Sequence, residues 1–167
     1  MKEISKSIID KLGAQRTAST PRANKKSLPA GCTLNKILID LGSDFVEGIT
    51  FTRGAKIRRG LNIYNLDIIY GEAPDDNNIH YRNEIFSGRI PKNAYTFGES
   101  PTGDQFCISC LTGEVYYWVH DAADGEIDTF LLAPSLDAFF KDLGADESTD
   151  MEALAKSKKI TSIDLDF

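Results

Sequence analysis

Cys107 and Cys110 form a CxxC pair, a spacing used both for zinc binding and for thiol redox chemistry. A zinc site would need two further ligands, and the other cysteine and imidazole side chains are only Cys32, His80 and His120. A redox pair normally lies at a helix N-terminus, where the helix dipole lowers the thiol pKa. This pair is expected within a strand, where residues three apart point to opposite faces. We therefore expect two buried structural cysteines.

His120 and Asp121 are adjacent and could form a general-base pair. Neighbouring residues of a strand point in opposite directions, so this pairing requires the strand to have ended before them. A structural or interface histidine is the favoured interpretation. The nearby Trp118 could stack on a base or a sugar, but without interleaved basic residues a role in core packing is favoured.

Other signatures of catalysis or ligand binding are missing from the sequence. It contains neither a nucleophile elbow nor a glycine-rich phosphate loop of the GxxxxGK[ST] or GxGxxG type. The acidic stretches at 75–76 and 121–124 lack the spacing of an EF-hand. We therefore predict a protein without catalytic residues, cofactor or metal, which shifts the interpretation toward a binding protein.

The composition is that of one soluble domain. The chain has 167 residues, a net charge of −6 and three cysteines, and the odd cysteine count argues against a disulfide framework and for a reducing compartment. No run approaches the roughly 20 apolar residues of a membrane span, and residues 1–10 do not resemble a signal peptide. A cytoplasmic location is expected. The acidic balance argues against direct nucleic-acid binding.

Charge is unevenly distributed along the chain. The charged residues within 16–26 are all basic, and a second basic group lies within 53–59. Residues 114–152 are strongly acidic, with Lys141 as their one basic residue. Such an asymmetry more often reflects a solvated face than a binding site.

The most regular part of the chain is 89–140. Alternating apolar residues predict strands at 104–110 and 114–120, joined by a tight link at Thr112-Gly113. A third apolar segment, 127–133, is followed by a helix with Ser135 as N-cap and Gly144 as stop.

The remaining segments give weaker signals. Helical spacing of apolar residues predicts helices at 4–12 and 33–42, and 14–30 reads as a flexible basic loop. A short strand is expected at 49–52, stopping at Arg53-Gly54, and another in the second half of 61–70. Residues 73–78 have turn chemistry, 79–86 show no decisive period, and 145–167 are expected to form a loosely ordered tail.

Five elements in order resemble the core motif of the SUKH superfamily, which includes bacterial immunity proteins and a fungal cell-wall assembly regulator. They are IIYG at 68–71, RIP at 89–91, FGESPTGDQFCIS at 97–109, GEVYYWVHD at 113–121 and SLDAFFKDL at 135–143. The resemblance covers about half the chain, 66–143. The sequence departs from the pattern at Asp104, where the family often has Asn, and Leu28-Pro29 lacks the following NGG.

The resemblance implies one domain over 1–167, of α/β class and α+β type, with a central and mostly antiparallel sheet flanked by helices. It also implies a non-enzymatic function by protein binding. Bacterial members are mostly immunity proteins encoded beside the cognate toxin that they neutralise, and many such toxins are nucleases. A nuclease presents a basic cleft, to which an acidic partner is complementary. The expected partner contacts are the acidic loop residues Asp75, Asp76, Asp121, Asp124 and Glu126.

Two alternatives remain at this point. The first is a regulatory or scaffold module of the same fold that binds a housekeeping protein, as in the fungal relatives. The second is a small metalloenzyme that uses Cys107, Cys110 and His120. The sequence does not indicate the oligomeric state.

Overall fold

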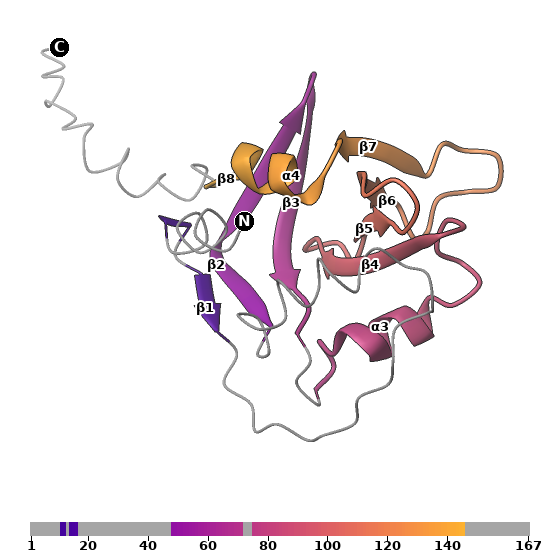
Figure 1. Ribbon diagram of the computed structural model, residues 1–167, viewed down its shortest axis with the longest axis horizontal. Coiled ribbons are helices and arrows are strands. Elements are labelled where there is room, and N and C mark those ends of the chain that lie inside the picture. Colours follow the sequence, from indigo (N-terminus) through magenta and orange to yellow (C-terminus); the bar gives the residue numbers. More distant parts are fainter. Residues whose placement is uncertain (1–10, 13, 17–47, 72–74, 146–167) are drawn as a thin grey trace, which may run out of the picture.

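A single antiparallel sheet organises the part of the chain that the computed structural model describes, residues 11–12, 14–16, 48–71 and 75–145 (Figure 1). The helices predicted at 4–12 and 33–42 fall almost entirely outside these ranges. Most of the 14–30 segment and nearly all of the 145–167 tail fall outside them as well.

The strands follow one another across the sheet in the order of the chain, β1 to β7, and β8 pairs with β2. Every strand pair is antiparallel. The elements are β1 (Ala14–Arg16), β2 (Ile49–Arg59), β3 (Asn62–Ile69), α3 (Ile79–Ile85), β4 (Ala94–Glu99), β5 (Gln105–Ser109), β6 (Val115–Trp118), β7 (Thr129–Ala133), α4 (Leu136–Asp142) and β8 (Gly144–Ala145). The predicted antiparallel α+β architecture is confirmed.

The strand predicted at 49–52 does not stop at Arg53-Gly54, and this prediction was wrong. β2 runs through to Arg59, with a shift of register between Thr50 and Ala55. Gly54 has φ +67°, a conformation that glycine adopts without steric cost. The irregularity is absorbed as a bulge because β2 pairs with β3 on both sides of it. β3 likewise occupies nearly all of the 61–70 segment, not only its second half.

The segment predicted as the loop 14–30 begins with a strand. Ala14, Gln15 and Arg16 pair with Phe51, Thr50 and Ile49 of β2. Their sequence has no strand pattern, so backbone pairing with a distant strand decides their conformation. This is the ordinary way in which tertiary context overrides local preference.

The turn predicted at 73–78 is confirmed where the structure describes it, at 75–78, and it leads into α3. Asn78 is the N-cap of this helix, and its side chain accepts hydrogen bonds from the backbone N–H groups of His80 and Tyr81. With seven residues, α3 is too short to show a helical period.

The central strands and the last helix match the predictions closely. β5 and β6 lie within the predicted segments, and Ser135 caps α4 by accepting a hydrogen bond from the N–H of Ala138 at 3.2 Å. Gly144 does not act as the helix stop. It pairs with Lys56 as part of β8, after a C-cap at Leu143.

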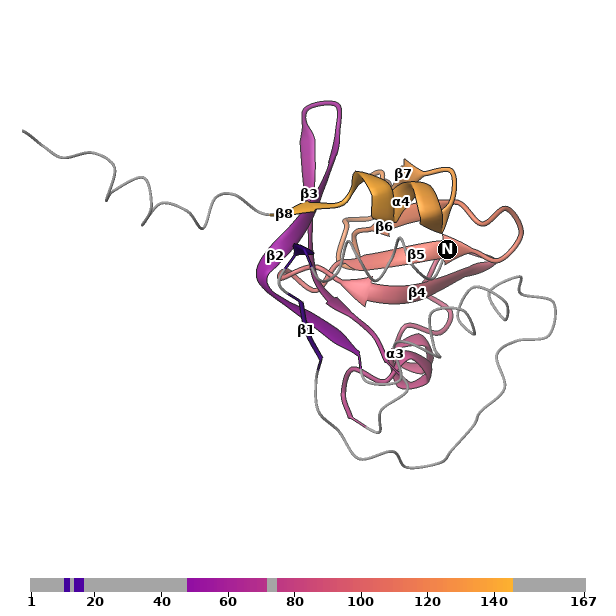
Figure 2. The ribbon, with the colours of Figure 1, turned by 60° about the vertical axis from the view of Figure 1, so that its left-hand side comes forward.

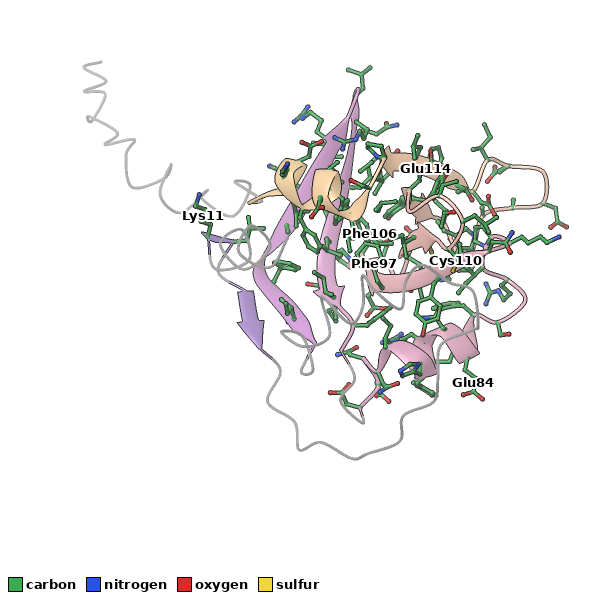
Figure 3. The ribbon with its side chains drawn as sticks, viewed as in Figure 1. Lys11, Glu84, Phe97, Phe106, Cys110 and Glu114 are labelled. Atoms are coloured by element: carbon green, nitrogen blue, oxygen red, sulfur yellow. The ribbon has the colours of Figure 1, made fainter. Side chains whose placement is uncertain are left out.

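The two helices cover opposite faces of the central strands (Figure 2). On the α4 side, Phe97, Phe106 and Phe139 are buried with ring centroids 5.7–6.4 Å apart. Figure 3 shows Phe97 and Phe106 within this interior. On the α3 side, Phe86 packs edge-on against Trp118. Trp118 is thus a core residue, as predicted.

Candidate partner-binding site

Three of the segments that connect the strands lie at the same end of the sheet. The register places Glu99 opposite Gln105, Gln105 opposite Trp118, and Trp118 opposite Thr129. Ile68, near the end of β3, lies opposite Glu99. The connections that begin at residues 70, 100 and 119 therefore leave the sheet from the same end.

All five predicted contact residues lie on two of these connections, but in separate groups. Asp75 and Asp76 follow β3, whereas Asp121, Asp124 and Glu126 follow β6. β4 and β5 lie between these strands. At about 4.8 Å per strand, β3 and β6, the strands that these two groups follow, lie roughly 14 Å apart in the sheet.

In the first group, the Asp75 side chain makes a hydrogen bond within the fold, whereas the Asp76 side chain makes none with the other described residues. The Asp75 carboxylate accepts a hydrogen bond from the N–H of Asn77 at 2.9 Å and closes the turn before α3. The Asp76 side chain is exposed, while its backbone carbonyl accepts a hydrogen bond from Arg82 Nε at 2.6 Å. Asp76 is therefore the better placed of the two for contact with a partner.

The second group projects from a loop held at both ends. Arg89 donates a hydrogen bond to the His120 carbonyl at 2.6 Å, and Trp118 Nε1 donates to the Asp128 carboxylate at 3.2 Å. Within the loop, Glu126 N–H donates to the Ala123 carbonyl, and the Glu126 carboxylate accepts from Ala123 N–H. The loop is thus ordered by its own hydrogen bonds.

Asp121 and Asp124 are exposed on this ordered loop. In the described part of the chain, neither makes a hydrogen bond or ion pair. Residues 114–140 contain no lysine or arginine. The loop therefore presents unneutralised negative charge in a fixed geometry, which favours a cationic partner.

Asp104 anchors the start of the loop. One oxygen, Oδ1, lies 3.1 Å from His120 Nδ1 and accepts the His120 backbone N–H at 3.3 Å. The other, Oδ2, accepts the hydroxyl groups of Tyr117 and Thr102, each at 2.8 Å. Partial burial opposes ionisation, but the hydrogen bonds from Tyr117, Thr102 and His120 outweigh it and lower the pKa of Asp104.

His120 pairs with Asp104, not with the adjacent Asp121 suggested by the sequence. β6 ends at Trp118, so the strand has ended before His120. The ring of His120 also lies beside Gly103, where an added Cβ would be 3.4 Å from His120 Cε1. The structural interpretation of His120 is supported.

Asp104, His120 and Asp121 together are a group that could hold a metal ion, with ligand atoms within 4.8 Å of one another. Both oxygens of Asp104 already accept hydrogen bonds, and His120 Nδ1 is directed at one of them. A cation would have to displace these contacts. The donor set fits a loop anchor better than a metal site.

The CxxC pair divides between the cores on the two faces of the sheet, but Cys110 lies one residue past the end of β5 and is half-buried, so the prediction of two buried cysteines within a strand holds for Cys107 alone. Cys107 is fully buried against Phe86 and Trp118, while Cys110 packs on the opposite core. Burial raises the pKa of the Cys107 thiol to about 12, so the thiol stays protonated. Cys107 is free whereas Cys110 is disulfide-bonded, which departs from the expectation that the chain has no disulfide framework.

A second network joins α3 to the same end of the sheet. Tyr70 Oη lies 2.9 Å from Glu99 Oε2 and 2.8 Å from Gln105 Oε1. Arg82 of α3 forms an ion pair with Glu99 at 3.3 Å and lies over the Tyr70 ring. Burial, followed by the proximity of the Glu99 carboxylate, raises the pKa of Tyr70.

The sequence reasoning missed the anchoring roles of Asp104, Arg89 and Glu99. Two signals were present: Arg89 belongs to the RIP motif, and Asp104 is a departure from the family pattern. The motif residues Tyr70, Arg89 and Trp118 all hold connections at this end of the sheet. The exposed acidic residues Asp76 and Asp124 lie outside the motifs that carry the resemblance.

The described residues thus form an antiparallel α+β domain that holds exposed loops at one end of its sheet. The model of the SMI1 / KNR4 family (SUKH-1) matches residues 30–142. The chain belongs to this family, and its assignment to the SUKH superfamily is confirmed.

The chain is also similar to the SPbeta prophage-derived uncharacterized protein YokK of Bacillus subtilis (strain 168), with 31% identity over 101 residues. The match covers 60% of this chain and 51% of the relative, so the chain spans about half the length of that protein. No solved structure matches the chain. Across the described ranges, no helix has the length and apolar character needed to cross a bilayer.

Proposed function

We propose that this protein is an immunity protein that binds and neutralises a cognate bacterial toxin. The observation that carries the proposal is the ordered acidic loop at 119–128, held by Asp104 and Arg89 at one end of the sheet of a SUKH-1 family member. Neutralisation would occur by covering the active site or substrate path of the toxin. It requires no catalysis and no cofactor.

A nuclease is the proposed class of toxin. A nuclease binds a polyanion and therefore carries a basic surface, to which exposed carboxylates are complementary. The carboxylates proposed to meet it are those of Asp76, Asp121, Asp124 and Glu126, with Asp75 supporting the turn. Complementary charge increases the association rate and discriminates against acidic partners.

Co-purification with the product of the neighbouring gene tests this proposal. The unaltered protein should retain that product on a column at low salt, and binding should weaken with rising ionic strength. The double variant Asp121→Lys and Asp124→Lys should slow association by about tenfold or more. The single variant Asp124→Lys should slow association as well, and its matched control is Asp137→Lys on α4, which makes the same charge reversal away from the loop and should leave the association rate nearly unchanged.

A further inference from the structure

β7 forms one edge of the sheet. It pairs with β6, and within the described ranges no strand lies on its other side. Val119 N–H donates to the Asp128 carbonyl at 2.7 Å, and Tyr117 lies opposite Phe130 in the same register. Hydrogen-bonded pairs alternate along an antiparallel ladder, so the backbone groups of Thr129 and Leu131 point away from β6.

The end of β7 nearest α4 is already covered. Arg59, at the end of β2, donates from Nε to the Leu132 carbonyl. The same guanidinium forms an ion pair with Asp142 of α4 at 2.8 Å. Arg59 thereby closes the edge at Leu132, and the open part is confined to Thr129–Leu131 and the loop before it. In Figure 1, this open part lies at the outer side of the sheet, beside the β6–β7 loop.

Exposed apolar side chains line the open part. Ile127 is 77% exposed and Leu131 is 55% exposed. With Thr129 between them, they occupy alternate positions, which place side chains on one face of an extended chain. Large exposed aliphatic groups beside an unpaired strand edge are a liability unless another chain covers them.

Charge indicates what kind of chain would cover this edge. The exposed Asp121, Asp124 and Glu126 precede the strand, and residues 114–140 include no lysine or arginine. The nearby cations Arg59 and Arg89 are both engaged, with Asp142 and with the His120 carbonyl. A second copy of this chain, with a net charge of −6, would bring like charge to this edge. A basic segment would be attracted to it.

We propose that the partner adds an extended basic segment to the open edge of β7 as a further strand. Backbone hydrogen bonds to Thr129 and Leu131 would supply affinity. The aliphatic side chains of Ile127 and Leu131 and the acidic loop would select an alternating apolar and basic sequence. This inference rests on the proposed immunity function and specifies how the same site binds.

The substitution Thr129→Pro tests the backbone contact directly. Proline removes an N–H that points away from β6, and edge strands tolerate proline at such positions. The control Thr129→Ala shortens the side chain and keeps the N–H. With the purified, inactivated product of the neighbouring gene as probe, Thr129→Pro should raise Kd by about tenfold or more, whereas Thr129→Ala should change it by less than about threefold.

A second measurement on the unaltered protein guards against misfolding of the proline variant. Amide hydrogen exchange of Thr129 and Leu131 should be fast in the free protein and slowed in the complex. If both amides exchange at the same rate in the free protein and in the complex, strand addition is overturned. If Asp124→Lys still weakens binding in that case, the immunity proposal stands. A dimer that Thr129→Pro dissociates would overturn the basic-partner proposal in favour of self-association. If the unaltered protein does not bind the probe, both proposals fail.

Discussion

Asp104 and His120 are 16 residues apart in sequence, yet Asp104 Oδ1 lies within 3.1–3.3 Å of both the imidazole Nδ1 and the backbone N of His120. This double contact fixes the point at which the chain leaves β6 and enters the acidic loop. The loop geometry therefore depends on one carboxylate that is itself no part of the proposed binding surface.

The substitution Asp104→Asn should destabilise the protein. An asparagine side chain has one uncharged acceptor oxygen in place of the two carboxylate oxygens. Either the hydroxyl groups of Tyr117 and Thr102 or the two nitrogen atoms of His120 therefore lose their charged acceptor. We expect the free energy of unfolding to fall by about 1–3 kcal/mol, measured by urea denaturation. Asp124→Asn, on the exposed loop, should stay within about 0.5 kcal/mol of the unaltered protein. Equal losses in the two variants would contradict the anchoring role.

Acid should loosen the same anchor only at unusually low pH. The folded-state pKa of Asp104 is lowered, so its contribution to stability is fully present above the unfolded value, about 3.9, and is lost as pH falls through the folded pKa. The chemical shift of the His120 amide, followed by NMR, should report a midpoint below that unfolded value. A midpoint at or above it would show that the hydrogen bonds do not stabilise the carboxylate.

Removing the Arg89 side chain should loosen the other attachment of the loop. Its guanidinium donates to the His120 carbonyl and lies 6.0 Å from the centre of the Trp118 ring. Arg89→Ala should reduce stability by about 1–2 kcal/mol through the lost hydrogen bond and stacking. Trp118 is the one tryptophan in the chain, so its emission should shift to longer wavelength as the ring becomes more exposed. Arg89→Lys should restore little, since a lysine cannot reproduce the planar guanidinium contact. Unchanged emission in the alanine variant would contradict this account.

The chemistry of Cys107 gives an independent test of the core. Its thiol is completely buried, and its pKa is raised to about 12, so almost no thiolate exists at neutral pH. Native protein treated with iodoacetamide should therefore remain unmodified at Cys107, as read by peptide mass spectrometry. In urea the same cysteine should react at the rate of an ordinary thiol. Rapid alkylation in the native state would mean that the face covered by α3 is open.

The parts of the fold that the sequence predicted are those set by local chemistry. The alternation in 104–110 and 114–120 and the N-cap at Ser135 depend on residues close in the chain. The continuation of β2 through Gly54 and the strand at Ala14–Arg16 depend on pairing with distant segments, which no local pattern reports. Helix α3 was not predicted because seven residues are too few to show a helical period, although Asn78 is a residue type that often caps a helix N-terminus.

In the candidate site too, features set by nearby residues could be predicted and features set by distant contacts could not. The acidic residues could be placed on loops from sequence, because turn residues surround them. Which of them the fold uses could not be predicted: Asp75 closes a turn, and Asp104 was passed over although it anchors the loop. Two partners of Asp104, Tyr117 and His120, are 13 and 16 residues away and meet it only through the register of β5 and β6.

The most direct test of the central claim is growth of a bacterial host that expresses the product of the neighbouring gene. Alone, that product should arrest growth, and co-expression of this protein should restore it. Restoration should be lost with Asp121→Lys combined with Asp124→Lys and kept with Asp137→Lys. A product that is harmless when expressed alone, or toxicity that this protein does not relieve, would contradict the immunity function.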